Sequence, residues 1–194
     1  TAGVNTLRPV IEIDGDLYKS ISIKQEAPSM PVGSTELRPH RLHVGLFDIK
    51  GDKFSRRTSV ELDVAGALTE VTELAGQKVA DLVLINDKDQ TYAKLRFDDR
   101  SIATMKSHLG NLDDSLARGL IWASLWDSCR DGELSTSDYV TIALNALKTE
   151  SDISIVAATY LQFETAIWAY ANPAKRDAIR TQVADATLAM LASS

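Results

Sequence analysis

The spacing of apolar residues along this chain changes once, close to Asp98. Before that point apolar and polar residues alternate, as Val60, Leu62 and Val64 do with the residues between them. After it, apolar residues recur every three or four positions. Alternation is typical of strands that bury one face, and a spacing of three to four is typical of helices. The sequence therefore predicts a multidomain fold with β-structure first and α-structure second.

The first domain is expected over residues 1–97. It contains roughly seven strand-like segments with short turn signals between them, as in an antiparallel β-sandwich. Leu17, Ile21 and Ile23 are expected on the buried face of one strand, with Tyr18 on its other face. The turn and loop signals are Asp14-Gly15-Asp16, Gly51-Asp52, Gly66, Gly76 and the longer stretch with Pro28, Pro31 and Gly33.

The second domain is expected over residues 98–194, with about five helices that pack as antiparallel neighbours. They form an α-helical array, either a bundle or the start of a HEAT-like solenoid, and the spacing leaves both open. The helix after Asp113 carries apolar residues on nearly all sides, from Leu116 to Cys129, so it is predicted to be central and buried. The predicted helix starts are Asp98 or Asp99, Asp113, Ser135 with Asp138 as a capping box, Asp152, and Pro173.

Composition and charge restrict the partners. The chain has 21 basic and 27 acidic side chains, a net charge of -6, so it has no basic surplus for nucleic acid. No apolar run reaches the roughly 18 residues of a membrane span, so no membrane partner is predicted. Cys129 is the single cysteine and cannot form an internal disulfide, which fits a reducing, cytoplasmic location.

A search for catalytic motifs predicts no catalytic, cofactor-binding or metal-binding residue. The chain has no H-E-x-x-H, no G-x-S-x-G, no P-loop and no dinucleotide-binding glycine pattern. His40 and His43 are three residues apart on a predicted strand, so they point to opposite faces and do not converge on a metal. His108 and these two are assigned surface or structural roles. Cys129 lies on the tryptophan-rich helix and is assigned to the core.

Three further groups have a functional and a structural interpretation, and the structural one is favoured for each. The aromatic residues could line a pocket, but their helical spacing favours core packing. The acids could suggest calcium, but without a calcium-loop spacing they are assigned to turns and caps. Arg56-Arg57 is assigned to a solvated strand edge rather than an anion site. The aromatic residues are Trp122, Trp126, Tyr160, Phe163 and Tyr170, and the acids are Asp81, Asp87, Asp89, Asp98 and Asp99.

Several stretches resemble a known family. The segment from Ala80 to Asp98 is similar to the strand-turn-strand that closes the small β-sandwich domain of the aminopeptidase N family, which are zinc exopeptidases. The helical segments are similar to the first helices of the helical C-terminal domain of that family. Thr91 and Lys94 depart from the family pattern, which has glycine and arginine there. The helical segments concerned run from 112 through 135 and over 150–152.

The resemblance implies a non-catalytic C-terminal portion of a zinc-dependent aminopeptidase that removes N-terminal residues from peptides. In the family the zinc ligands and the motif that holds the substrate amine lie in a preceding catalytic domain. None of these motifs occurs here, so no residue role is carried over, and zinc is expected only in the missing catalytic domain of the parent enzyme. The sandwich would be a spacer, and the helical part would wall or lid the active-site chamber.

The partners implied are the missing catalytic domain of the same chain and the peptide substrates of the parent. The chain starts at Thr1 rather than Met, and we expect this start to be a cut inside a longer protein. Apolar residues close to Ser194, such as Leu188, suggest self-association through exposed helix faces. The alternative function is a stand-alone peptide- or protein-binding module made of a sandwich and a helical array.

Overall fold

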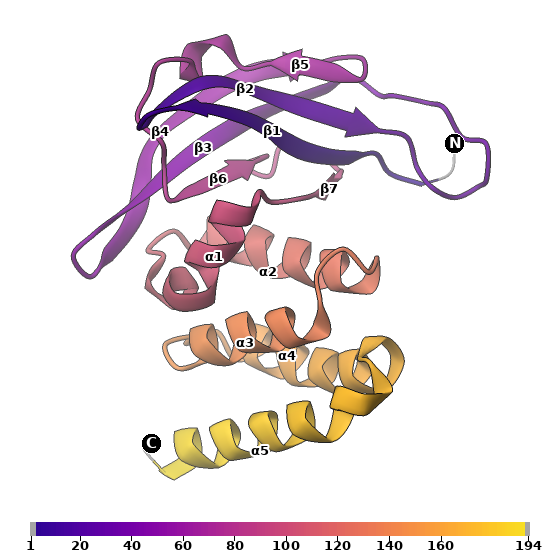
Figure 1. The fold of residues 1–194 in the computed structure, drawn as a ribbon, viewed down its shortest axis with the longest axis vertical. Helices are drawn as coiled ribbons and strands as arrows, with labels where there is room; N and C mark the ends of the chain where they lie inside the picture. The colour runs from indigo at the N-terminus through magenta and orange to yellow at the C-terminus, as the bar shows by residue number, and fades with distance from the viewer. Residues whose placement is uncertain (1–2, 193–194) are drawn as a thin grey trace.

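The computed structural model describes residues 3–192 and has the expected order of β-structure followed by α-structure (Figure 1). Thr1 and Ser194, on which the expectations about the chain ends rest, lie outside the described residues. The strands in this range are β1 (Thr6–Asp14), β2 (Leu17–Glu26), β3 (His40–Lys50), β4 (Lys53–Val64), β5 (Leu68–Glu70), β6 (Leu82–Ile85) and β7 (Lys94–Leu95). The α-helices are α1 (Asp99–His108), α2 (Ser115–Arg130), α3 (Thr136–Leu147), α4 (Ile153–Thr165) and α5 (Arg176–Ala192). Short helical segments are η1 (Thr72–Leu74), η2 (Leu109–Asn111), η3 (Ala166–Tyr170) and η4 (Pro173–Lys175).

The strands form two facing sheets, and the helices lie beneath one of them. The strand orders are β5-β2-β1-β7 and β4-β3-β6. An apolar cluster that includes Ile23 and Val44 fills the space between the sheets. Figure 1 shows the β4-β3-β6 sheet facing the helices, with α1 and α2 next to it and α5 farthest away. The predicted β-then-α fold is therefore confirmed.

Strand β6 is buried on both faces. Val83 and Ile85 belong to the core between the two sheets, whereas Leu82 and Leu84 belong to a second core that they share with the helices. Alternate residues of a strand point to opposite faces, so a strand covered on both sides reads as an unbroken apolar run. The helices and the sandwich thus share one continuous core at β6 instead of meeting at a solvated surface.

One strand pair differs from the expected antiparallel arrangement. β7 lies parallel to β1, with Thr6 opposite Lys94 and Leu7 opposite Leu95. A tight hairpin forces neighbouring strands to be antiparallel, but β7 arrives from β6, which belongs to the other sheet. The direction of β7 was therefore not constrained by a hairpin.

The expected orientation of one end of β2 was wrong. Tyr18 is buried and its hydroxyl accepts a hydrogen bond from the Ala80 amide at 2.9 Å, whereas Leu17 is exposed. The β1–β2 register skips Lys19, because Ser20 lies opposite Glu12 and Tyr18 lies opposite the next residue of β1. One extra residue in a strand reverses the faces of all residues beyond it.

The predicted helix starts are confirmed with two shifts. One is at α5, which begins at Arg176 because the expected start, Pro173, opens the short segment η4 that precedes it. The Asp98 side chain caps α1 by accepting from the Ser101 amide, and Asp152 caps α4 in the same way. Ser135 accepts from the Asp138 amide, as a capping box predicts. The cap of α2 is Asp114, not the expected Asp113, and its carboxylate accepts from the Ala117 amide.

The aromatic residues of the helices pack into the shared core. The rings of Trp126 and Tyr139 are 5.5 Å apart between centroids, and those of Tyr139 and Phe163 are 6.2 Å apart. These tilted and edge-to-face contacts confirm the core interpretation for Trp126 and Phe163. The interpretation was wrong for Tyr170, which is 43% exposed. Helix α2 buries most of its apolar residues, but Leu116 is 49% exposed, so the expectation that α2 is covered on all sides was wrong at its first turn.

The helical array becomes more exposed towards the C-terminal end. Ile179 is buried, whereas Leu161 on α4 and Leu188 on α5 are 69% and 65% exposed. Helices α4 and α5 lie at the edge of the molecule in Figure 1, with no further layer beyond α5 in the described part. Between residues 3 and 192 no helix combines the length and the apolar character needed to cross a bilayer.

The shared core gives a first prediction. Leu82→Ala removes a fully buried side chain between the β4-β3-β6 sheet and the helices, so we expect the free energy of unfolding to fall by about 2–5 kcal/mol. Chemical denaturation followed by far-UV and near-UV circular dichroism measures this loss. The control Leu161→Ala removes an exposed leucine and should change stability by no more than about 0.5 kcal/mol. Equal effects of the two variants would contradict a shared core.

Candidate functional site

The histidines and the cysteine do not form a catalytic centre. His40 is buried, and its Nδ1 lies 2.6 Å from the Thr91 hydroxyl. His43 contacts Gln90 and Lys88 instead, and His108 lies at the end of α1. Within residues 3–192, no three side chains of His, Cys, Asp or Glu lie close enough together to hold a metal ion.

Cys129 is a core residue. It is buried on α2, and its Sγ is 4.0 Å from the Thr136 hydroxyl. Burial raises the pKa of the thiol, and the contact with Thr136 opposes this only in part. The raised pKa disfavours the thiolate, which is the nucleophilic form. The structure therefore agrees with the core assignment of Cys129.

The acids expected in turns and caps include one with a different role. Asp98 caps α1, and Asp81 accepts hydrogen bonds from the Ile49 amide and from Arg100. Asp87 is fully buried and its carboxylate binds Arg56. The assignment of Arg56-Arg57 to a solvated edge was therefore wrong, and Arg57 also forms an ion pair, with Asp48 at 3.0 Å.

A bulge in β4 determines where Arg56 points. In the β3–β4 pairing, Leu46 lies opposite Thr58 but Phe47 lies opposite Arg56, so Arg57 is an extra residue. Without it, Arg56 would share a face with Thr58 and Val60 and would point towards the core between the sheets. With it, Arg56 lies on the face of Phe47, which belongs to the core shared with the helices. The bulge thus places the Arg56 guanidinium at the interface between the sheet and the helices.

Arg56, Asp87 and Asp114 form an ion cluster, here called the Arg56 cluster, in which Asp87 is buried and the other two side chains are partly exposed. Arg56 binds Asp87 with two hydrogen bonds, Nε to Oδ2 at 2.6 Å and Nη2 to Oδ1 at 2.8 Å. Its Nη2 also binds Asp114 Oδ2 at 2.6 Å, and its guanidinium lies 5.1 Å from the ring centroid of Phe47. Ser59 donates to Asp87 at 3.0 Å. Because Asp114 caps α2, this cluster joins strand β4 and the turn after β6 to the N-terminus of α2.

Gly45 provides the space that Asp87 occupies. A Cβ at this position of β3 would lie 2.6 Å from Cγ of Asp87 and 2.8 Å from a ring carbon of Phe47. Any side chain at position 45 would therefore collide with the buried carboxylate. Asp87 can occupy this place only because position 45 of β3 is a glycine.

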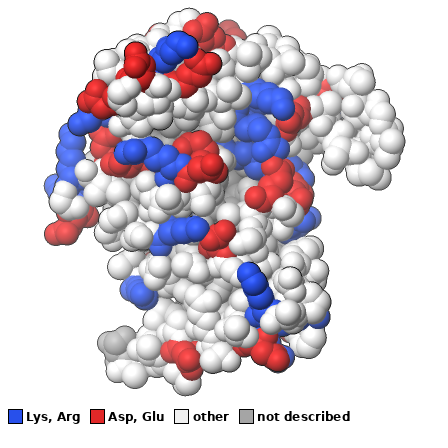
Figure 2. All heavy atoms as spheres, in the orientation of Figure 1, with Lys and Arg blue, Asp and Glu red and all other residues white. Residues whose placement is uncertain are grey.

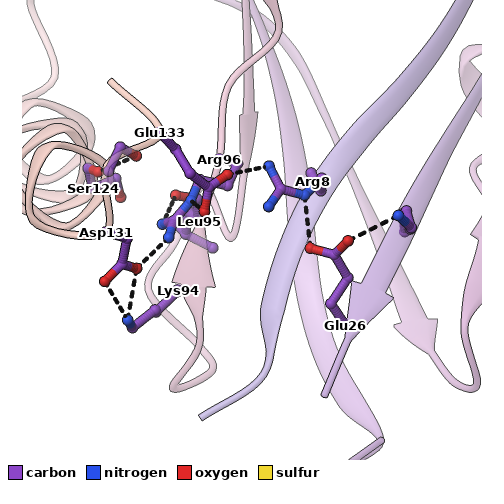
Figure 3. A network of polar contacts seen from close by, with 10 residues as sticks. Arg8, Glu26, Lys94, Leu95, Arg96, Ser124, Asp131 and Glu133 are labelled. Carbon is purple, nitrogen blue, oxygen red and sulfur yellow. Dashed lines mark hydrogen bonds and ion pairs between the residues drawn. The ribbon is translucent and has the colours of Figure 1, made fainter. Parts of the chain in front are cut away.

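A second ion network joins the other end of α2 to the sandwich. It contains Arg8, Glu26, Lys94, Arg96, Asp131 and Glu133 and is here called the Arg96 network (Figure 3). The Arg96 side chain is only 4% exposed and binds Asp131 and Glu133, which follow α2. Glu133 also binds Arg8 of β1 at 2.6 Å, and Arg8 binds Glu26 of β2 at 2.8 Å. Cations from β1, from β7 and from the residue just after β7 therefore converge on the loop between α2 and α3.

Three of the acids, Asp114, Asp131 and Glu133, are held in the ionised form. Burial acts to raise the pKa values of Asp131 and Glu133, but hydrogen bonds from Lys94, Arg8 and Arg96 outweigh it, and both pKa values are lowered. The pKa of Asp114 is lowered in the same way, with burial opposed by the Ala117 amide and Arg56. Paired and ionised carboxylates are poor general acids or bases at neutral pH. The arrangement can hold two parts of the molecule together, but it supplies no nucleophile or proton donor.

A hollow of about 620 Å³ lies beside the Arg96 network. Arg8, Lys94 and Arg96 line one side, and the loop residues Pro28 and Met30 line another. Each of these cations already binds a carboxylate of the same network, so the hollow presents no unpaired charge from them to a small anion. Sequence reasoning missed both junctions, because the ion pairs join residues between 18 and 125 positions apart, and no local motif marks them.

A family model described as the ERAP1-like C-terminal domain matches residues 82–193. The chain is 46% identical, over 196 aligned residues, to aminopeptidase N of Streptomyces lividans. The alignment covers 98% of this chain and 23% of that relative. The chain therefore spans less than a quarter of the length of the curated relative that it matches.

The Arg56 cluster gives a second prediction. Arg56→Met leaves the buried Asp87 carboxylate without its cation, so the free energy of unfolding should fall by about 3–5 kcal/mol. The control Arg41→Met removes an exposed arginine of β3 that binds Glu61 and Asp63 and should cost at most about 1 kcal/mol. Urea denaturation of both variants measures the difference. If the two variants lose similar stability, the Arg56 cluster does not hold the junction.

His40 gives a prediction about acid. Burial, and secondarily the charge of Arg38, lowers the pKa of His40 below the ordinary value of 6.5. The unfolded chain then binds this proton more readily than the folded chain, so stability is full above pH 6.5 and declines as the pH falls below it. A His40→Gln variant should lose less stability than the wild type between about pH 7.5 and 5.5, measured by thermal unfolding. An equal loss of stability on acidification in the His40→Gln variant and the wild type would contradict the prediction.

Proposed function

Because this chain belongs to the ERAP1-like C-terminal domain family, we propose that it is the non-catalytic C-terminal portion of a zinc-dependent aminopeptidase that acts on peptides. The observation that carries this proposal is the match of nearly the whole chain to less than a quarter of an aminopeptidase N. The length of that relative leaves room for a catalytic domain outside the matched region. In this proposal the partners of the chain are the catalytic domain of its own polypeptide and, through it, peptide substrates.

The residues present do not fit the zinc of such an enzyme. The part of the chain described by the structure brings together no set of three metal-ligating side chains, and its histidines have separate partners. No catalytic step is therefore assigned to any residue of this chain. Zinc and the groups that activate water belong, in this proposal, to the catalytic domain.

The proposed mechanical role is a fixed wall of the active-site chamber. Helix α2 is joined to the sandwich at its N-terminus by the Arg56 cluster and just beyond its C-terminus by the Arg96 network. The β6 side chains also share a core with the helices. These three connections support a helical part that keeps its position relative to the sandwich, and they favour a wall over a swinging lid. We also propose that the sandwich and the helical part are separate domains that divide at 97/98.

A stand-alone module that binds a peptide or a protein is the second candidate function. Exposed apolar side chains on the helical part favour it, notably Trp168, which is 56% exposed and has Arg180 5.2 Å above its ring. The same exposed helix faces, with Leu188 among them, are where we propose self-association to occur. We also propose a cytoplasmic location, as expected from the single cysteine.

The missing ligands give a prediction about activity. We expect the purified chain to show no hydrolysis of aminoacyl p-nitroanilides and to retain no stoichiometric zinc after dialysis, because no described residues could hold the ion. Absorbance assays and atomic emission measure the two quantities. Turnover that a chelator abolishes would contradict the prediction.

The two candidate functions are separated by a binding experiment. The catalytic portion encoded upstream in the same gene, expressed separately, should bind this chain if the first proposal holds. A reading frame that begins just before Thr1, with no catalytic portion upstream, would favour the stand-alone module.

A further inference from the structure

The loop between β2 and β3 forms an uncharged projection at one end of the sandwich. Residues 27–35, here called the 27–35 lobe, contain no Asp, Glu, Lys or Arg. Met30 is 67% exposed and Val32 is 87% exposed. Figure 2 shows this part of the molecule as a white lobe that extends beyond the charged surface of the sandwich. Large apolar side chains at the tip of a projection have no role in the core of this chain.

The lobe is held firmly at its base. The Asn5 side chain donates to the carbonyl oxygens of Glu26 and Glu36, at 3.2 and 2.7 Å, and so ties the two ends of the loop together. Arg38 donates to the carbonyl of Gly3 at 2.8 Å. Gly3 packs closely on the lobe, because a Cβ there would lie 2.6 Å from Cβ of Pro28. A loop fixed in this way loses little conformational entropy when its tip is buried by a partner.

The surface around the lobe has the organisation of a protein interface. The hollow beside it is lined by Pro28 and Met30 from the lobe and by charged side chains of the Arg96 network. Those charges are already paired with one another, so they can form a polar rim that needs no new counter-charge. An apolar centre with a polar rim is typical of contacts between proteins. A small anionic ligand would find no unpaired cation of this network in the hollow.

We propose that the 27–35 lobe is the surface on which the catalytic portion of the same polypeptide docks, an inference that rests on the proposed function. The N-terminal segment forms the base of the lobe through Gly3 and Asn5 (Figure 1). In the proposed enzyme, the catalytic portion would therefore join the chain next to this surface. Tethering raises the effective concentration of the preceding portion at the lobe. A second copy of the chain is a poorer occupant, because a symmetric dimer needs a self-complementary surface and a projecting tip is convex.

The test uses the 194-residue chain and the separately expressed catalytic portion from the same gene, with affinity measured by isothermal titration calorimetry. We expect Met30→Ser/Val32→Ser to weaken binding by about tenfold or more, since two anchors lose their apolar contact. The matched control is Leu161→Ser, which changes an equally exposed apolar residue on α4, away from the lobe in Figure 1, and should bind like the wild type.

The outcomes separate this inference from the proposed function. Unchanged affinity of the double variant overturns the lobe as docking surface while the proposed function stands. Failure of the wild-type chain to bind at all contradicts the proposed function and the lobe with it. Hydrogen exchange of the wild-type chain gives an independent readout, because residues 27–35 should become protected on binding. A wild-type dimer that the double variant converts to a monomer, seen by sedimentation velocity, would assign the lobe to self-association and overturn the inference.

Discussion

The junction between sheet and helices depends on one buried carboxylate. Asp87 has no solvent exposure, and a charge in such a place must be paired and hydrogen-bonded. Arg56 supplies the pair, Ser59 adds a hydrogen bond, and Gly45 leaves the volume that the carboxylate fills. The same guanidinium then reaches Asp114, so the interaction that neutralises a sandwich residue also orients the first turn of α2.

Helix α2 transmits this constraint to the rest of the helical array. Its N-terminus is attached through Asp114, and Asp131 and Glu133 attach the loop that follows it to Arg96. A 16-residue helix connected to the sheets at both ends has little freedom to tilt. Helices α3, α4 and α5 pack beyond it, and their position relative to the sandwich follows from α2 and from the shared core. For a proposed chamber wall, this rigidity is the property that matters.

The chemistry of the chain agrees with a supporting role. The acids at the two junctions are paired, and the Cys129 thiol is buried with a raised pKa. His40 and His43 have separate partners. What the described surface does offer is apolar contact, at the 27–35 lobe near one end and along α4 and α5 near the other. Contact surfaces and rigid connections are what the proposed role, a non-catalytic portion of a larger enzyme, requires.

The sequence by itself determined the order of β- and α-structure and most of the helix starts, because periodicity and capping depend on residues within a few positions of one another. It also predicted that Cys129 and most of the aromatic stripe belong to the core, although Tyr170 is exposed. Only the tertiary structure decided which way Tyr18 and Arg56 point, because a single extra residue in a strand reverses its faces and leaves no signal in composition. The tertiary structure also decided the parallel direction of β7, because the chain reaches β7 by crossing from one sheet to the other. The partners of Arg56 and Arg96 lie 31 or more residues away, and pairing over that distance is set by how the layers stack, not by local sequence.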